Sequence, residues 1–306
     1  MHESVLLEQS IEALVSDVNG CYVDGTFGRG GHARALLSAL GPDASVLVMD
    51  KDPQAICVAS DLSKSDPRVH VYHGSFADLP TVLTGLGWAG VNGILLDLGV
   101  SSPQLDDDAR GFSFQRTGPL DMRMNNQAGL TAAQYLAEID ESDLVEILRE
   151  YGEERYAKRI AGAIVEARQK KPITTTGELA EIVKVAHPKW EKHKHPATRT
   201  FQAVRIAVNR ELDDLDNLLA NVVSCLVPGG RLAVISFHSL EDRRVKHFMR
   251  DMTRGPKIPR GIPVMGEAAL GPLRLVGKAI KPEEREVAAN VRARSAVLRV
   301  AERRCL

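Results

Sequence analysis

Short apolar runs alternate with helix-like runs along the first hundred residues, and this alternation constrains the fold more than any other feature. The apolar runs are 21–23, 45–49, 69–72 and 93–96, and the helical runs between them are 31–40, 53–62 and 76–86. Strands that alternate with helices of this length form parallel sheets built from βαβ units. Because the strands are apolar nearly throughout, we expect helices on both faces. The pattern predicts an α/β protein with a doubly wound, mostly parallel sheet.

The alternation stops after Asp97 and resumes only near the end of the chain. Residues 106–200 contain no convincing strand, whereas 231–237 and 296–301 are again strand-like. We therefore predict a discontinuous α/β domain of residues 1–106 and 201–306, interrupted by an inserted all-helical domain of residues 107–200. The stretch 198–226 fits one long helix or two joined helices, and the Gly/Pro-rich stretch 255–277 fits a loop.

Composition limits the cellular setting of the chain. No apolar run approaches the roughly 18 residues that a membrane span needs, and the residues from Met1 to Ser4 lack the features of a signal peptide. The four cysteines lie far apart and form no CxxC pair, which is typical of a reducing compartment. We expect a cytoplasmic protein without a membrane partner.

The charge is unevenly distributed although the net charge is only −1. Residues 243–306 hold 16 basic and 6 acidic side chains, whereas the rest of the chain holds 23 and 34. A basic region of this kind suits a polyanionic partner such as RNA. A solvated surface balanced by the acidic part of the chain explains the same pattern equally well.

A glycine-rich turn lies between the first predicted strand and the first predicted helix. Gly28 to Ala33 matches the G-x-G-x-x-G/A pattern, and Asp50 follows Gly28 by 22 residues, close to the spacing of a ribose-binding acid. Such a turn holds either a dinucleotide or S-adenosylmethionine. If the ligand is S-adenosylmethionine, we expect the backbone of Gly30 and Gly31 to lie along its methionine end. Asp24 suits the cofactor's amino group or, equally, the backbone of the turn.

Polar or aromatic residues also follow the other predicted strands. Asp50 is expected to accept from the ribose hydroxyls. Phe76 suits an adenine face or the core. Asp97 lies where open α/β sheets bind ligands and is an active-site candidate. Gln104 suits a polar ligand group or an exposed loop.

The segment after the fifth predicted strand contains one more candidate. His238 either faces the cleft or caps the next helix, and Ser239 to Asp242 has the spacing of a capping box. The sequence 193–195, His-Lys-His, has no carboxylate or cysteine cluster nearby, so no metal site is predicted. No Ser or Cys lies at a recognisable nucleophile elbow.

Taken together, these motifs resemble those of the MraW/RsmH family of bacterial rRNA methyltransferases. The segments that carry the resemblance are 24–32, 50–55, 93–104, 111–124, 198–212 and 227–242. The run from Asp97 to Asp106 and the run from Gly118 to Met124 are the most specific of them. The resemblance implies a class I methyltransferase fold, with S-adenosylmethionine as cofactor. It implies methylation of the N4 amine of a cytidine in 16S rRNA of the small ribosomal subunit.

The resemblance also implies which residues contact the cofactor, namely Gly30, Gly31, His32, Asp50, Phe76, Asp97 and Gln104. His32 and Asp97 enter this set only through the family. Cytosine N4 is a weak nucleophile because its lone pair is delocalised, and an acceptor bonded to its N–H would localise that pair. We expect Asp97 to be this catalytic residue, with an oxygen of the 101–103 loop as the alternative.

Further expectations concern RNA binding and the competing functions. Phe112 and Phe114 either stack on the target base or pack within the insertion. Phosphate contacts are expected from Arg199, Arg205 and the basic region. The competing classes are a nicotinamide-dependent oxidoreductase and a non-catalytic, RNA-binding ribosome-assembly factor. A homodimer is compatible with the long insertion, although nothing in the pattern requires one.

Overall fold

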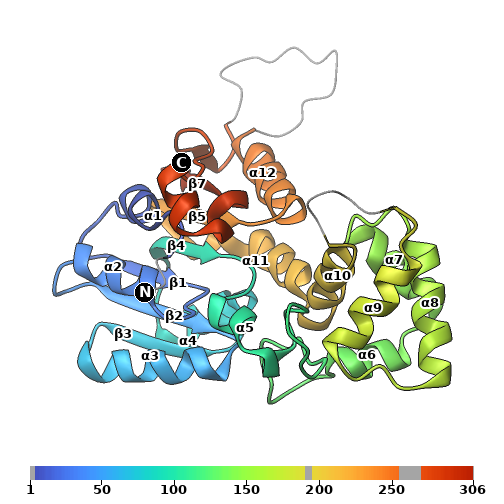
Figure 1. Ribbon diagram of the computed structural model, residues 1–306. Helices are drawn as coiled ribbons and strands as arrows, with labels where there is room; N and C mark the ends of the chain where they lie inside the picture. The colour runs from blue at the N-terminus through green and yellow to red at the C-terminus, as the bar shows by residue number, and fades with distance from the viewer. Residues whose placement is uncertain (1–3, 190–194, 255–269, 306) are drawn as a thin grey trace, which may run out of the picture. The chain divides into compact units, whose positions relative to one another are not determined.

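The protein has one mixed sheet in the part of the chain that its computed structural model describes, residues 4–189, 195–254 and 270–305. In these residues the sheet has seven strands in the order β3-β2-β1-β4-β5-β7-β6 (Figure 1). The five strands β3, β2, β1, β4 and β5 are parallel, and β7 is antiparallel to both β5 and β6. The strands are β1 (Cys21–Asp24), β2 (Ser45–Asp50), β3 (Val69–His73), β4 (Val91–Asp97), β5 (Leu226–Ser236), β6 (Leu273–Leu275) and β7 (Val297–Arg303). The prediction of a doubly wound, mostly parallel sheet is confirmed.

Helices cover both faces of this sheet, as the apolar strands predict. Consecutive strand residues point to opposite faces, so Tyr22 and Val23 of β1 belong to two different hydrophobic cores. The first core receives side chains from α1 (Leu7–Leu14), α2 (Gly31–Ala39) and α3 (Pro53–Ser65). The second receives them from α4 (Leu79–Leu86), α11 (Glu211–Cys225) and α12 (Ser239–Thr253).

Three local expectations need correction or refinement. The predicted loop 255–277 contains a short strand, β6, whose Leu273 is buried in the second core. The stretch 198–226 forms two helices, α10 (Ala197–Asn209) and α11, because Arg210 adopts a left-handed conformation with φ of 53°. The residue that caps α12 is His238 rather than Ser239, and Asp242 instead accepts hydrogen bonds from Arg299.

The chain divides into two compact units, residues 1–99 with 213–306 and residues 100–212. The second unit is helical and has its own core, to which Leu144, Ile160, Phe201 and Val204 contribute. Because Phe201 and Val204 of α10 pack into this core, the helical unit extends beyond residue 200. Its helices are α5 (Ser102–Asp106), α6 (Ala132–Glu138), α7 (Glu141–Glu150), α8 (Ala157–Lys170), α9 (Thr176–Ala186) and α10.

The aromatic residues near the start of this unit pack within it. Phe112 is buried in the helical core, and the Phe114 ring lies 4.7 Å from the rings of both Phe201 and His195. His193 lies outside the described residues, so the structure does not describe the 193–195 segment as a whole. None of the helices in the described ranges has the length and apolar character to cross a membrane.

Candidate active site

The glycine turn leads from β1 into α2 and contains a residue that requires glycine. Gly30 has φ of 76°, and its N–H donates to the Phe27 carbonyl at 2.8 Å. A Cβ added to Gly30 would lie 2.6 Å from the Phe27 ring. The left-handed turn at Gly30 starts α2 a few residues after β1, and the N-terminus of a helix is a common place for a ligand to bind.

Replacing Gly30 with alanine should therefore damage both the fold and the turn. A left-handed residue with a side chain costs about 1–2 kcal/mol, and the clash with Phe27 adds to this cost. We expect a lower free energy of unfolding in urea and weaker binding of S-adenosylhomocysteine by calorimetry. Gly85 of α4 is the matched control, because an added Cβ there meets nothing within 4 Å. Equal ligand affinities for the two variants would contradict the role of the turn.

Asp50, at the end of β2, is held by backbone amides. Its Oδ2 accepts the Gly28 N–H at 2.7 Å, and its Oδ1 accepts the Asp52 N–H at 2.8 Å. Burial raises the pKa of Asp50 overall, while these hydrogen bonds lower it. The carboxyl therefore ties β2 to the glycine turn, and its remaining lone pairs can accept from hydroxyl groups.

Two carboxyls, the buried Asp24 and the partly buried Asp97, end the neighbouring strands β1 and β4. Burial raises the pKa of Asp24 to about 7 and that of Asp97 to about 8, and the negative charge of Asp24 contributes to the shift of Asp97. Although 26% of the Asp97 side chain is exposed, its Oδ1 is enclosed. Asp24 Oδ2 and Asp97 Oδ1 have no hydrogen-bond partner among the described residues.

His32 lies beside Asp97 at the start of α2. Its Nδ1 is 3.7 Å from Asp97 Oδ2, and its Nε2 is 3.1 Å from the carbonyl of Val5. Burial lowers the pKa of His32 to about 4, so the imidazole is neutral at pH 7. With Nε2–H donating to the Val5 carbonyl, Nδ1 faces Asp97 as an acceptor. The Asp97 backbone is held in turn, because its N–H donates to Thr26 Oγ1 at 2.6 Å.

The remaining predicted contacts are placed differently. Phe76 is partly buried and packs against the second sheet core, at the start of the short helix that follows β3. Gln104 belongs to the helical unit, where its Oε1 accepts the Ser101 N–H at 2.9 Å and caps α5. The other predicted contacts all lie in the unit that holds the sheet, as Phe76 does: Gly30, Gly31, His32, Asp50 and Asp97.

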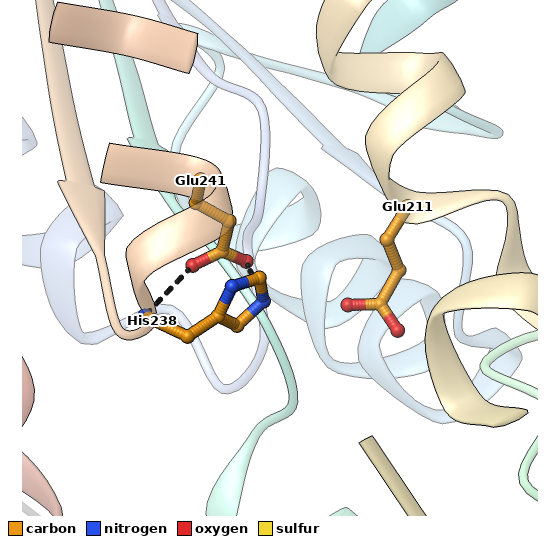
Figure 2. Close-up of side chains that lie close together, drawn as sticks. All are labelled: Glu211, His238 and Glu241. Carbon is orange, nitrogen blue, oxygen red and sulfur yellow. Dashed lines mark hydrogen bonds and ion pairs between the residues drawn. The ribbon is translucent and has the colours of Figure 1, made fainter. Parts of the chain in front are cut away.

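A second set of buried polar atoms lies at the end of β5 and directly after it. Ser236 Oγ and both ring nitrogens of His238 have no hydrogen-bond partner in the described part of the chain. The Glu241 carboxylate accepts the N–H of Phe237 at 2.9 Å. It also accepts the N–H of His238 at 3.4 Å (Figure 2). Sequence reasoning missed Glu241. Its position three residues after His238, at the beginning of a helix, was the available signal.

The chemistry of these groups fits S-adenosylmethionine. Enclosed carboxyl oxygens without partners are costly unless a ligand completes them. A cationic sulfonium near Asp24 and Asp97 would favour their ionised forms. The glycine turn beside them has no room for a side chain at Gly30.

The sheet order, with β7 antiparallel, and the carboxyls at the ends of β1, β2 and β4 define a class I, Rossmann-like methyltransferase domain. Residues 1–304 match the sequence model of one such group. The chain belongs to the MraW methylase family. The chain is therefore an S-adenosylmethionine-dependent methyltransferase, as expected. The alternative prediction of a nicotinamide-dependent oxidoreductase is wrong.

Individual relatives are similar over almost their whole length. The ribosomal RNA small subunit methyltransferase H of Chromohalobacter salexigens is 54% identical over 304 residues, which cover 99% of this chain and 91% of the relative. The protein of the same name from Legionella pneumophila strain Paris is 55% identical over 303 residues, covering 99% and 98%. That from Thioalkalivibrio sulfidiphilus is 54% identical over 304 residues, covering 99% and 97%.

Proposed function

We propose that this protein transfers the methyl group of S-adenosylmethionine to the N4 amine of a cytidine in 16S rRNA of the small ribosomal subunit. The observation that carries the proposal is the full-length similarity to small-subunit rRNA methyltransferases, combined with a site of enclosed, unpartnered carboxyl oxygens. A protein with this substrate acts in the cytoplasm. A vestigial assembly factor would have no reason to keep these costly groups unpaired.

The cofactor contacts that we propose are those that the family resemblance implies. Gly30, Gly31 and His32 would contact the methionine end, and Asp50 would accept from the ribose hydroxyls. Phe76 would cover the adenine, and Gln104, from the helical unit, would supply a further polar contact. The inserted helical domain, predicted as residues 107–200 and forming the unit of residues 100–212, would recognise the substrate.

Asp97 is the proposed catalytic residue. When bound, the cofactor supplies an electrophilic methyl group, and positioning of the target amine then governs the rate. A cationic cofactor favours the ionised Asp97 carboxylate, which accepts one N–H of the amine. That hydrogen bond localises the lone pair on N4. To reach Asp97, the base must leave any stack.

The experiment is a transfer of labelled methyl groups to small subunits, to protein-free 16S rRNA and to large subunits. We expect label in the small-subunit RNA, and N4-methylated cytidine after nuclease digestion and mass spectrometry. Label on another atom, or on ribosomal protein, would overturn the proposal. Sedimentation of the same preparation tests the homodimer.

Phosphate contacts are now expected from the exposed basic residues of segment 278–294, which include Lys278, Lys281 and Arg294. Arg205 is not available in the way expected, because its guanidinium donates two hydrogen bonds of 2.8 Å to Glu211. Arg199 is partly buried in α10 and makes contacts of its own. We therefore attribute the salt dependence of RNA binding mainly to the C-terminal segment.

RNA affinity should fall steeply with salt, and neutralising this segment should flatten the dependence. Removal of one cationic side chain from a phosphate reduces the slope of log K against log salt by about 0.7 for single strands. The variant carrying Lys278→Ala, Lys281→Ala and Arg294→Ala should therefore lower the slope by about 2. Fluorescence anisotropy with an RNA fragment at several salt concentrations measures the slope. Lys64→Ala, on α3 and paired with Asp61, is the control. An unchanged slope would contradict this assignment.

A further inference from the structure

His238 occupies the same edge of the sheet as Asp97. Strands β4 and β5 are parallel neighbours in which Asp97 pairs with Ile235, and the Leu98 N–H donates to the Ile235 carbonyl at 3.0 Å. His238 follows the end of β5 by two residues and caps α12. The fold therefore brings the imidazole out at the carboxyl end of the strand next to Asp97.

The His238 ring is enclosed and its polar atoms are unused. Its side chain is 13% exposed, and neither ring nitrogen makes a hydrogen bond within the described residues. His238 and Glu241 are the capping-box pair at the start of α12, yet neither ring nitrogen of His238 reaches hydrogen-bond geometry with a group in the described residues. Enclosed nitrogens without partners point to a bound group that completes them.

Glu241 is positioned to orient this ring. Its Oε2 accepts the N–H groups of Phe237 and His238. Its Oε1 lies 3.2 Å from His238 Nε2, in a contact that does not meet the geometry of a hydrogen bond (Figure 2). Catalytic hydrogen bonds are often this loose before substrate binds. A carboxylate beside Nε2 favours the tautomer with its proton on Nε2. Nδ1 then keeps its lone pair.

We infer that His238 Nδ1 accepts the proton that the target amine releases, and that Glu241 is its positioning residue. The inference rests on the proposed function. As the bond between N4 and the methyl carbon forms, the bond from that carbon to sulfur breaks and sulfur keeps the electron pair. N4 then carries a positive charge and one proton too many. His238 takes this proton and becomes an imidazolium, which Glu241 stabilises, and later releases it to water.

This division of roles leaves Asp97 ionised throughout the transfer. Asp97 accepts one N–H of the amine and stabilises the developing positive charge, whereas His238 removes the other proton. Glu241 also raises the pKa of Asp97 through its negative charge, so the two groups interact electrostatically. Protonation of His238 weakens the repulsion between them.

The test separates proton transfer from helix capping. Asparagine is among the best capping residues but is not a base, so His238→Asn should keep the fold and the affinity for S-adenosylhomocysteine. Its single-turnover rate on small subunits should fall about 10²-fold or more, the usual contribution of a general base. Glu241→Gln should have a smaller effect in the same direction. The exposed His247 of α12 provides the control, His247→Asn, which should keep the wild-type rate.

Chemical rescue is the second readout. Added imidazole should restore part of the single-turnover rate of His238→Ala and have no effect on Asp97→Ala. If wild type forms N4-methylated cytidine and His238→Asn keeps the full rate, the role of His238 is refuted while the proposed function stands. If His238→Asn unfolds, absence of rescue in a folded His238→Ala refutes it. If wild type forms no such product, the proposed function itself fails.

Discussion

Asp97→Ala is expected to abolish methyl transfer while leaving the protein folded. The carboxyl ends β4, its Oδ1 is enclosed without a partner, and no other described residue offers a carboxylate at the end of that strand. Loss of a preorganised group of this kind costs about 10²–10³-fold in rate, and Asp97→Asn should fall in that range. Single-turnover transfer to small subunits is the measurement. Rates near those of wild type would refute the catalytic role.

The charge of Asp97 gives the same variants a second readout. Folding raises its pKa from 3.8 to about 8, so the folded protein keeps a proton that the unfolded chain loses. The free energy of unfolding should therefore fall as pH rises from about 4 to about 8. In Asp97→Asn this fall should be smaller, as urea unfolding at pH 5 and pH 8 will show. Asp61→Asn, on the exposed face of α3, is the control.

Asp50→Ala is expected to weaken S-adenosylmethionine binding about 100-fold or more, because hydrogen bonds to charged groups contribute about 1.5–3 kcal/mol each. The variant loses the proposed ribose contacts and also frees the Gly28 N–H that holds the turn. Titration calorimetry measures the loss. Asp52→Asn, which keeps a capping residue at the start of α3, is the matched control.

The two carboxyl variants should differ in how they treat cofactor and product. Asp50 would contact the adenosine part, which S-adenosylmethionine and S-adenosylhomocysteine share, so its loss should weaken both to the same degree. Asp97 lies near the proposed place of the sulfonium, which only S-adenosylmethionine carries. Its neutral variants should therefore lose more affinity for the cofactor than for the product. A reversed pattern would exchange the two assignments.

Most of the sheet is predictable from the sequence because strand and helix signals are local. The central strands are apolar runs bounded by turns, and each is confirmed. The short strand β6 is not predicted, since Leu273–Leu275 gains its strand conformation only from pairing with β7. The break at Arg210 cannot be located from the sequence, because nothing in the helical pattern marks a left-handed residue there.

The candidate site is predictable in outline only. Asp50 and Asp97 can be found because acids at strand ends converge on one edge of a parallel sheet. The unpaired polar atoms of Asp24, Ser236 and His238 cannot be predicted from the sequence, because whether a polar atom has a partner depends on tertiary packing. The relation of Glu241 to His238 is difficult to recognise, because Ser239 and Asp242 have the same spacing of three residues and suggest a different capping pair.

The pairing of β4 with β5 has a consequence for how the enzyme folds. Asp97 and Ile235 are neighbours in the sheet, yet the entire helical unit separates them along the chain. Loop-closure entropy grows slowly with length, by about 0.6 kcal/mol per doubling, so the cost to stability is modest. Contacts between such distant segments form late, however. We expect the helical unit to become protected from hydrogen exchange first, and the edge that carries Asp97 and His238 to assemble in the slowest step.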